Sequence, residues 1–266
     1  MPYEKGCRMV CTESSSPILW LQGISKSFGG VQAVADLTFG VELGKVTALV
    51  GPNGAGKTTV FNIATGFVRT DFGSITLSGR RIDQLEPHVI ARMGVVRTFQ
   101  NPRVISYLTV QENLLAAIPN LPGEKCWGAL FNFRRSKEMS IALESCEKLL
   151  EMTHMKEKAR LRGKELNFGE QRIINVLQAI LSQAKVILVD EPTVGLDSDM
   201  QHRLATLLRQ TVDDFERAVV LVEHNMEFVM NIADHVILLV GGQIVFGGSP
   251  DEMKTNEMFH RLYLGV

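Results

Sequence analysis

The stretch from Gly51 to Thr59, with the sequence GPNGAGKTT, constrains this chain more than any other. An apolar run at 45–50 precedes it and a helix-like segment at 60–66 follows it, so a strand, a glycine loop and a helix come in that order. This is the context that the phosphate-loop pattern G-x-x-x-x-G-K-[ST] requires. The N–H groups of such a loop and of the helix start favour an anion. The stretch therefore predicts a binding site for a chain of phosphates.

Two side chains of this loop have predicted roles. Lys57 is expected to reach the β and γ phosphates, and the Thr58 hydroxyl is expected to hold Mg²⁺. The other nucleotide-binding positions predicted from the loop are Asn53, Gly54, Ala55, Gly56 and Thr59. The alternative is a chance glycine loop at a strand end, which the flanking elements and the complete pattern disfavour.

Length and charge limit the classes of protein. With 266 residues and 45% hydrophobic content the chain can bury one substantial core, so one domain with a subdomain is expected. The net charge of -1 lacks the basic footprint that nucleic-acid binding usually needs. The basic, aromatic segment 131–135 is too short to indicate RNA binding and is better read as a solvated helix start.

The N-terminal residues argue against a secretory signal, and the cysteines indicate a reducing compartment. Residues 1–17 are polar, lack the apolar run of a secretory signal, and are expected to form a disordered tail. No apolar stretch approaches the roughly 18 residues of a membrane span, so the chain is expected to be soluble while able to sit on a membrane protein. The cysteines match neither a zinc site nor a disulfide framework and are expected to be free thiols: Cys7, Cys11, Cys126 and Cys146.

Alternation of strands and helices predicts an α/β fold on both sides of the phosphate loop. The expected elements are strands at 18–23, 33–41, 45–50, 74–77 and 95–99, and a helix from Pro87 to Gly94. Phe28 precedes a glycine pair, and it is either a strand-edge packing residue or a ring on which an adenine stacks. Gln100 is either a polar strand end or a group that reaches a nucleotide's metal and a neighbouring protein.

The alternation stops between Thr109 and Phe168, where the sequence is almost wholly helical. This predicts an all-helical subdomain at about 109–183, inserted into the α/β core. Near its end, Asn167 and Glu170 are spaced as in a capping box, ahead of a helix. A helix start with a bare glycine, Gly169, is also a second possible anion site.

Carboxylates follow a fully apolar strand at 186–189. An acidic strand end alone is more often structural, but together with a phosphate loop it predicts that Asp190 holds Mg²⁺ and that Glu191 is a general base toward water. His224 follows another apolar strand, at 218–222. A histidine there is usually a surface residue, yet ligands gather at these strand ends, so a γ-phosphate contact is favoured.

In this order the features resemble the ATP-binding cassette ATPases from about Ile18 to the end of the chain. The matching features are the phosphate loop 51–58, Gln100, a signature at 166–170, the acidic strand 186–191, a turn at Asp197 and His224. The resemblance implies an α/β P-loop NTPase (RecA-like) core with an N-terminal antiparallel β-subdomain and the inserted helical subdomain, within one ATPase domain at 18–266. It also implies that the ligands are ATP and Mg²⁺.

Residue roles follow from the same resemblance. Phe28 would stack on adenine, Gln100 would join the metal site to a transmembrane partner, and His224 would orient the γ-phosphate and water. The catalytic set is thus Glu191, His224 and Gln100, and the metal set is Thr58, Gln100 and Asp190. In a head-to-tail dimer, the signature of one subunit would complete the other subunit's site through Asn167, Phe168, Gly169 and Glu170.

The segments 97–101, 108–115 and 263–265 resemble those of branched-chain amino-acid importer ATPases, as does the long stretch 119–140. The implied partners are a second ATPase, equal or different, membrane permeases and, indirectly, an extracytoplasmic binding protein, with no nucleic acid. The implied location is the cytoplasmic face of the cell membrane. Alternatives are an ATPase of a lipopolysaccharide-export or urea/amide system, a soluble cassette protein acting on ribosomes or DNA, and a phosphotransfer kinase.

The signature departs from the family pattern LSGGQ. Asn167 replaces the serine, Phe168 the first glycine and Glu170 the glutamine, and Gln178 stands where an arginine is usual. The chain's own phosphate-binding and acidic residues are complete, so the departures concern only the half-site that it would offer to a partner.

Overall fold

The computed structural model describes residues 16–121 and 137–264 of the chain. Most of the predicted tail, the segment 131–135 and all the cysteines except Cys146 lie outside the described residues. The chain divides into two compact units. The first comprises the residues up to Arg97, Lys185–Glu191 and the residues from Arg209 on, and the second comprises Thr98–Ala184 and Pro192–Leu208.

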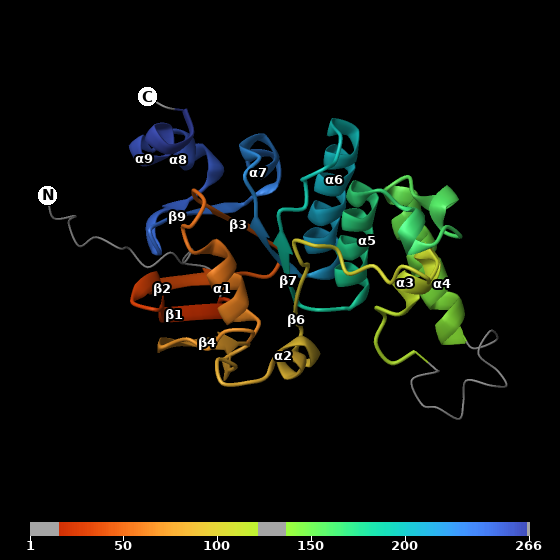
Figure 1. Cartoon of the computed structure of the whole chain (residues 1–266), viewed down its shortest axis with the longest axis horizontal. Coiled ribbons are helices and arrows are strands. Elements are labelled where there is room, and N and C mark those ends of the chain that lie inside the picture. Colours follow the sequence, from red (N-terminus) through yellow and green to blue (C-terminus); the bar gives the residue numbers. More distant parts are fainter. Residues whose placement is uncertain (1–15, 122–136, 265–266) are drawn as a thin grey trace, which may run out of the picture. The chain divides into compact units, whose positions relative to one another are not determined.

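An antiparallel sheet of four strands begins the first unit, with the order β2-β1-β4-β5 (Figure 1). Its strands are β1 (Leu19–Phe28), β2 (Val31–Val41), β4 (Phe72–Leu77) and β5 (Arg80–Arg81). Alternate side chains of β1, among them Leu19 and Leu21, are buried while their neighbours are more exposed, as expected for a strand with one covered face. The predicted N-terminal antiparallel β-subdomain is confirmed.

The second sheet of this unit has six strands in the order β10-β9-β3-β8-β7-β6. They are β3 (Val46–Val50), β6 (Val95–Arg97), β7 (Val186–Asp190), β8 (Ala218–Val222), β9 (His235–Val240) and β10 (Gln243–Gly248). All neighbours are parallel except β9 and β10. Every residue of β3, β7 and β8 is buried, which is why these strands are continuous apolar runs.

Strand β6 is shorter than the sequence predicts. It ends at Arg97 rather than at residue 99, and its last pair is Arg97 with Leu188 of β7. Thr98 and Phe99 belong to the second unit. The expectation was wrong because residues typical of strands, Thr98 and Phe99, continue past the last residue that pairs with the sheet.

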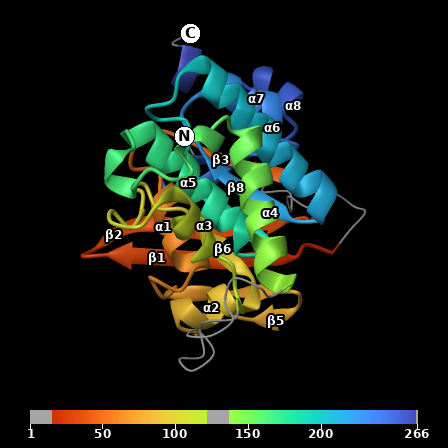
Figure 2. The ribbon, with the colours of Figure 1, turned by 90° about the vertical axis from the view of Figure 1, so that its right-hand side faces the viewer.

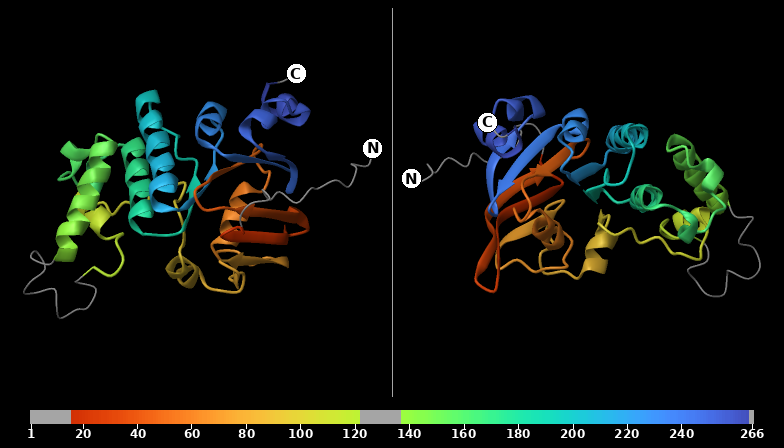
Figure 3. Two further views of the ribbon diagram at one scale, coloured as in Figure 1. Left: turned by 180° about the vertical axis from the view of Figure 1, so that it is seen from behind. Right: turned by 45° about the horizontal axis from the view of Figure 1, so that its top comes forward.

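Helices of the first unit are α1 (Lys57–Ala64), α2 (Pro87–Met93), the part of α6 (Ser198–Phe215) from Arg209 on, α7 (Met226–Ile232), α8 (Pro250–Lys254), α9 (Glu257–Phe259) and a π-helical segment η3 (His260–Leu264). One buried apolar cluster joins the two sheets and the phosphate-loop helix, and it includes Leu21 of β1, Leu49 of β3 and Phe61 of α1. Figure 3 shows α8 and α9 at the end of the β9–β10 hairpin. Because β3 before the phosphate loop and α1 after it both contribute side chains to the buried cluster, the loop is anchored at both of its ends.

The second unit is helical in its described part. Its elements are α3 (Val110–Leu115), α4 (Lys137–Met152), the 3-10 turns η1 (Lys156–Lys158) and η2 (Gly163–Glu165), α5 (Phe168–Leu181) and the first half of α6 (Ser198–Phe215). Helices α3, α4 and α5 pack on one another, as Figure 2 also shows, through buried residues such as Leu114, Cys146 and Leu177. The residues of α4 that are buried in this packing, such as Ala142, Leu149 and Leu150, form one apolar face of the helix.

Candidate ATPase site

The phosphate loop leads from β3 into α1, as the sequence predicts. Its lysine is held by the loop itself, since Lys57 Nζ donates to the carbonyl oxygens of Gly51 (2.7 Å) and Pro52 (3.0 Å). Lys57 is 7% exposed, and burial lowers its pKa while the charges of Glu191 and Asp190 oppose that shift. Lys57 therefore lies among the loop carbonyl groups, and its pKa is affected by the charges of both carboxylates.

Glycine is required in this loop by close backbone contacts. A Cβ at Gly51 would lie 2.1 Å from the carbonyl oxygen of Leu239. At Gly56, where φ is 105°, it would lie 2.4 Å from that of Ala33. The loop is also tied to the β9–β10 turn, because the Gly242 N–H donates to the Ala55 carbonyl oxygen at 3.0 Å.

The predicted metal-binding residues of this unit offer only oxygen donors. Thr58 is exposed at the start of α1, and Asp190 ends β7. Among the described residues no group of three or more His, Cys, Asp or Glu side chains forms a metal cluster. One hydroxyl and one or two carboxylates suit Mg²⁺, which is usually held by few protein ligands together with waters and substrate phosphates.

The acidic strand end and the predicted histidine come together. His224 Nε2 lies 3.2 Å from Glu191 Oε1, with the two side chains 39% and 20% exposed. Glu191 has a positive φ of 46°, a sparsely populated conformation for a non-glycine residue that is found most often at functional sites. Its N–H donates to the Val222 carbonyl oxygen of β8 at 2.8 Å, and this bond holds the strained residue in place.

Glu223 has a structural role that the sequence analysis missed. Its buried carboxylate accepts from the backbone N–H groups of His224 (2.8 Å) and Asn225 (3.1 Å). The Asn225 side chain in turn accepts from the Phe228 N–H and caps α7. These bonds fix the backbone of the histidine, whose own side chain remains partly exposed.

Phe28, at the end of β1, has a ring available for stacking. The residue is 48% exposed, and the ammonium group of Lys26 lies 5.5 Å from the ring centroid. Lys26 is itself paired with Asp71 at 2.6 Å. An exposed aromatic ring on the phosphate-loop unit is compatible with adenine stacking, which stays a prediction.

The signature residues lie in the second unit, at the start of α5. The predicted capping box is confirmed: Asn167 Oδ1 accepts from the Glu170 N–H, and Glu170 Oε2 accepts from the Asn167 N–H, both at 2.9 Å. Glu170 also forms an ion pair with Lys158. The negative charge that Glu170 adds to the signature is therefore balanced within the same unit.

Close packing explains the glycine of the signature. A Cβ at Gly169 would lie 2.5 Å from the carbonyl oxygen of Gly195. Phe168 is 46% exposed, and the guanidinium of Arg172 lies 4.9 Å from its ring centroid. The Asp197 carboxylate of the predicted turn accepts from the Met200 N–H at the start of α6.

Gln100 also belongs to the second unit, where α5 holds its backbone. Arg172 Nη2 donates to the Gln100 carbonyl oxygen at 3.0 Å, and Asn175 Nδ2 donates to that of Phe99 at 3.3 Å. Gln178, which replaces the usual arginine, donates to the Asn113 carbonyl oxygen at 3.1 Å and so joins α5 to the end of α3. The first unit therefore gathers Lys57, Thr58, Asp190, Glu191 and His224, while Gln100 and the signature are residues of the other unit.

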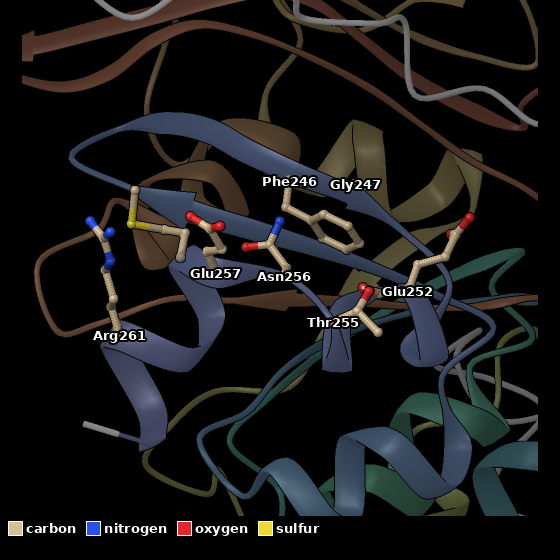
Figure 4. Close-up of a pocket in the computed structure, with 8 residues that line it drawn as sticks. Phe246, Gly247, Glu252, Thr255, Asn256, Glu257 and Arg261 are labelled. Carbon is tan, nitrogen blue, oxygen red and sulfur yellow. The ribbon is translucent and has the colours of Figure 1, made fainter. Parts of the chain in front are cut away.

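A separate cavity of about 590 Å³ lies between β10 and the C-terminal helices of the first unit. Figure 4 shows Phe246 and Gly247 on the strand, with the Asn256 side chain next to Phe246 and Arg261 at the far end of the pocket. None of the residues predicted for the nucleotide site lines it.

Two further findings concern the predicted class of protein. Among the residues described, no helix combines the length and apolar composition that crossing a bilayer requires. Cys146 is a free, buried thiol, and burial raises its pKa to about 11. For this cysteine the predicted free thiol is confirmed.

Known proteins resemble the chain over almost its whole length. The ABC transporter family matches residues 34–194. The high-affinity branched-chain amino acid transport ATP-binding protein BraF of Pseudomonas aeruginosa is 37% identical over 94% of this chain and 99% of its own. LivG of Escherichia coli, with the same description, is 34% identical over the same shares.

A solved structure agrees with these relatives. The ADP conformation of MJ1267, an ATP-binding cassette of an ABC transporter, superposes with a TM-score of 0.78 at 28% identity, over 95% of this chain and 100% of that one. The chain therefore belongs to the ABC transporter family and is an ATPase with the P-loop NTPase fold that the sequence predicts. It binds adenine nucleotide through its cassette.

Proposed function

We propose that the chain is the ATP-hydrolysing subunit of an importer of branched-chain or similar hydrophobic amino acids. The observation that supports ATP hydrolysis is the contact of His224 with Glu191, whose side chains are 3.2 Å apart. Burial lowers the pKa of Lys57 in the phosphate loop, and the charge of the same carboxylate opposes that shift. The transported substrate rests on relatives that are described as branched-chain amino acid transport proteins.

In the proposed mechanism the loop N–H groups and Lys57 bind the phosphates, and Glu191 accepts a proton from the attacking water. His224 holds Glu191 and orients the water and the γ-phosphate. Thr58, Asp190 and Gln100 would hold Mg²⁺, which would supply positive charge to neutralise the phosphates. Phe28 stacks on the adenine.

The second half of the site comes, in this proposal, from the signature of another ATPase subunit in a head-to-tail dimer. Because Asn167 Oδ1 is used to cap α5, its amide Nδ2 is the group left to donate to a phosphate oxygen. The ion pair with Lys158 balances the Glu170 carboxylate, so an approaching phosphate meets less negative charge. An Asn-Phe-Gly-Glu signature can therefore serve where Ser-Gly-Gly-Gln is usual.

The proposed assembly is a homo- or heterodimer at the cytoplasmic face of the membrane, bound to permease subunits that receive substrate from a binding protein. The helical part at about 109–183 is the proposed inserted subdomain, and the loop at Gln100 the proposed link to the permease. No helix among the described residues suits a bilayer, which is consistent with a peripheral subunit.

The test is uptake of labelled leucine, isoleucine and valine by cells of the source organism in which the gene carries Glu191→Gln. Loss of this uptake with unchanged uptake of urea and unchanged lipopolysaccharide export supports the proposal. Unchanged leucine uptake with loss of either other activity assigns the subunit to that system instead. Co-purification of the tagged chain with ribosomes rather than membranes would favour the soluble alternative.

A further inference from the structure

Arg97 is a buried cation beside the acidic strand end, and none of the roles above uses it. It is the last residue of β6, and its side chain is 7% exposed, against 5% for that of Asp190. Its Nη2 donates to Asp190 Oδ2 at 3.0 Å. A buried ion pair of this kind costs desolvation, so its presence is weak evidence of a contribution to stability.

The same guanidinium reaches the phosphate-loop helix. Arg97 Nη1 donates to Asn62 Oδ1 at 2.5 Å, and the guanidinium carbon lies 5.8 Å from the ring centroid of Phe61. Both of these residues belong to α1. Since the two nitrogens are held in one rigid plane, Arg97 fixes the Asp190 carboxylate relative to the helix that carries Thr58.

Lys57 is a second cation near the Asp190 carboxylate, so the Arg97–Asp190 ion pair also affects Lys57. The charge of Asp190 acts on Lys57 as well as on Arg97. If Arg97 were absent, Lys57 would be an available cation for the Asp190 carboxylate. A lysine engaged by Asp190 is less available to phosphate oxygens, and an Asp190 turned toward Lys57 is less available to a metal ion.

We propose that Arg97 is a positioning residue: through Asn62 and Asp190 it fixes the metal-binding carboxylate to the phosphate-loop helix and leaves Lys57 to the nucleotide. This inference rests on the proposed role of Asp190 at Mg²⁺. Groups that hold a metal-binding carboxylate contribute about 10- to 100-fold to metal affinity. Arg97 therefore increases the gain in ATP affinity that Mg²⁺ brings.

The test compares ATP dissociation constants of the full chain, measured with a fluorescent ATP analogue in Mg²⁺ and in EDTA. The variants are Arg97→Lys, which keeps the charge but not the rigid fork, Arg97→Met, and Asp190→Asn as the reference. Arg81→Met is the control for loss of an arginine paired with an aspartate, because Arg81 donates to Asp83 at 2.8 and 3.1 Å, away from the loop, although its own side chain is 62% exposed. Thermal unfolding of each protein without nucleotide reports its folding.

The quantity compared is the dissociation constant in EDTA divided by that in Mg²⁺. We expect this ratio to fall about tenfold or more in Arg97→Lys and Arg97→Met. The dissociation constant of Arg97→Lys in EDTA should stay near that of the unmodified chain. Arg81→Met keeps the ratio. A ratio that is unchanged or higher in Arg97→Lys overturns the inference, as does an equal loss of affinity in both media. If Asp190→Asn also leaves the ratio unchanged, the proposed role of Asp190 fails first. Should Arg97→Met not fold, Arg97→Lys alone decides.

Discussion

His224 Nε2 lies 3.2 Å from Glu191 Oε1, although the two residues follow different strands. Glu191 directly follows β7 and His224 comes shortly after β8, and these strands are parallel neighbours in which Asp190 pairs with Val222. The carboxyl ends of adjacent parallel strands lie at one edge of the sheet, where ligands bind in open α/β folds. The sheet thus brings together two polar residues that are far apart in the sequence.

Replacing His224 by alanine is expected to lower the rate of ATP hydrolysis by about 100-fold, since a positioned acid–base group contributes about 10²- to 10⁴-fold. ATP affinity should change far less than the rate, because the glycine loop and Lys57, which bind the phosphates, are intact. Phosphate release under saturating ATP measures the first, and equilibrium binding the second. The control is His202→Ala, which should keep the parent rate; equal losses in both variants would contradict the role of His224.

Asn167→Ala removes a helix cap and the proposed phosphate donor together. The free energy of unfolding should fall by about 1 kcal/mol, and in the Glu191→Gln background ATP should no longer drive dimer formation. Asn167→Ser keeps a capping oxygen and a donor, so it should retain both properties. Urea unfolding and size-exclusion chromatography measure them. A monodisperse ATP-dependent dimer of Asn167→Ala would refute the donor role.

The Lys158–Glu170 ion pair predicts a rescue. In the Glu191→Gln background, Lys158→Ala leaves the Glu170 carboxylate unbalanced at the signature, so the ATP concentration that drives dimer formation should rise severalfold. Adding Glu170→Gln should restore it, because the charge that needed balance is gone. Lys164→Ala is the control for loss of a lysine nearby. Failure of Glu170→Gln to restore dimer formation would mean that Lys158 acts through folding alone.

His235 predicts a pH dependence of stability. Its Nε2 is buried and has no hydrogen-bond partner in the described part of the chain. Burial lowers its pKa, against the opposing charges of Glu42 and Glu252. The unfolded chain therefore binds more protons just below pH about 6.5, and the free energy of unfolding should fall as the pH drops through that range.

His235→Gln should reduce this loss of stability on acidification. Urea unfolding at pH values of about 7.5, 6.5 and 5.5 measures it, with His88→Gln, on the exposed side of α2, as the control. The same slope in His235→Gln as in the parent would exclude His235 as the cause.

Local patterns predicted much of the fold and of the site. Three features each depend on fewer than about twenty consecutive residues, and their geometry follows from local preferences. They are the phosphate loop, the strand that ends in Asp190 and the Asn167–Glu170 cap. Arg97 was different. Its partner Asp190 is 93 positions away in the sequence. The residues near Arg97 therefore gave no basis for predicting its ion pair with this carboxylate.

The predicted end of β6 was wrong for a related reason. Val95–Phe99 has the composition of a strand, but its pairing stops at Arg97 opposite Leu188 of β7, and a single sequence does not contain its partner's register. Glu223 was overlooked because it adjoins His224, and its backbone hydrogen bonds depend on the turn that follows β8.

The most direct test of the account is the rate of ATP hydrolysis by the full chain carrying Glu191→Gln, measured together with its ATP affinity. An amide cannot accept the proton of the attacking water, so the rate should fall at least about 100-fold. The affinity should stay within about threefold of the parent, because the glycine loop and Lys57 are intact. Hydrolysis at the parent rate would contradict the assignment of Glu191 as the general base, and with it the proposed mechanism.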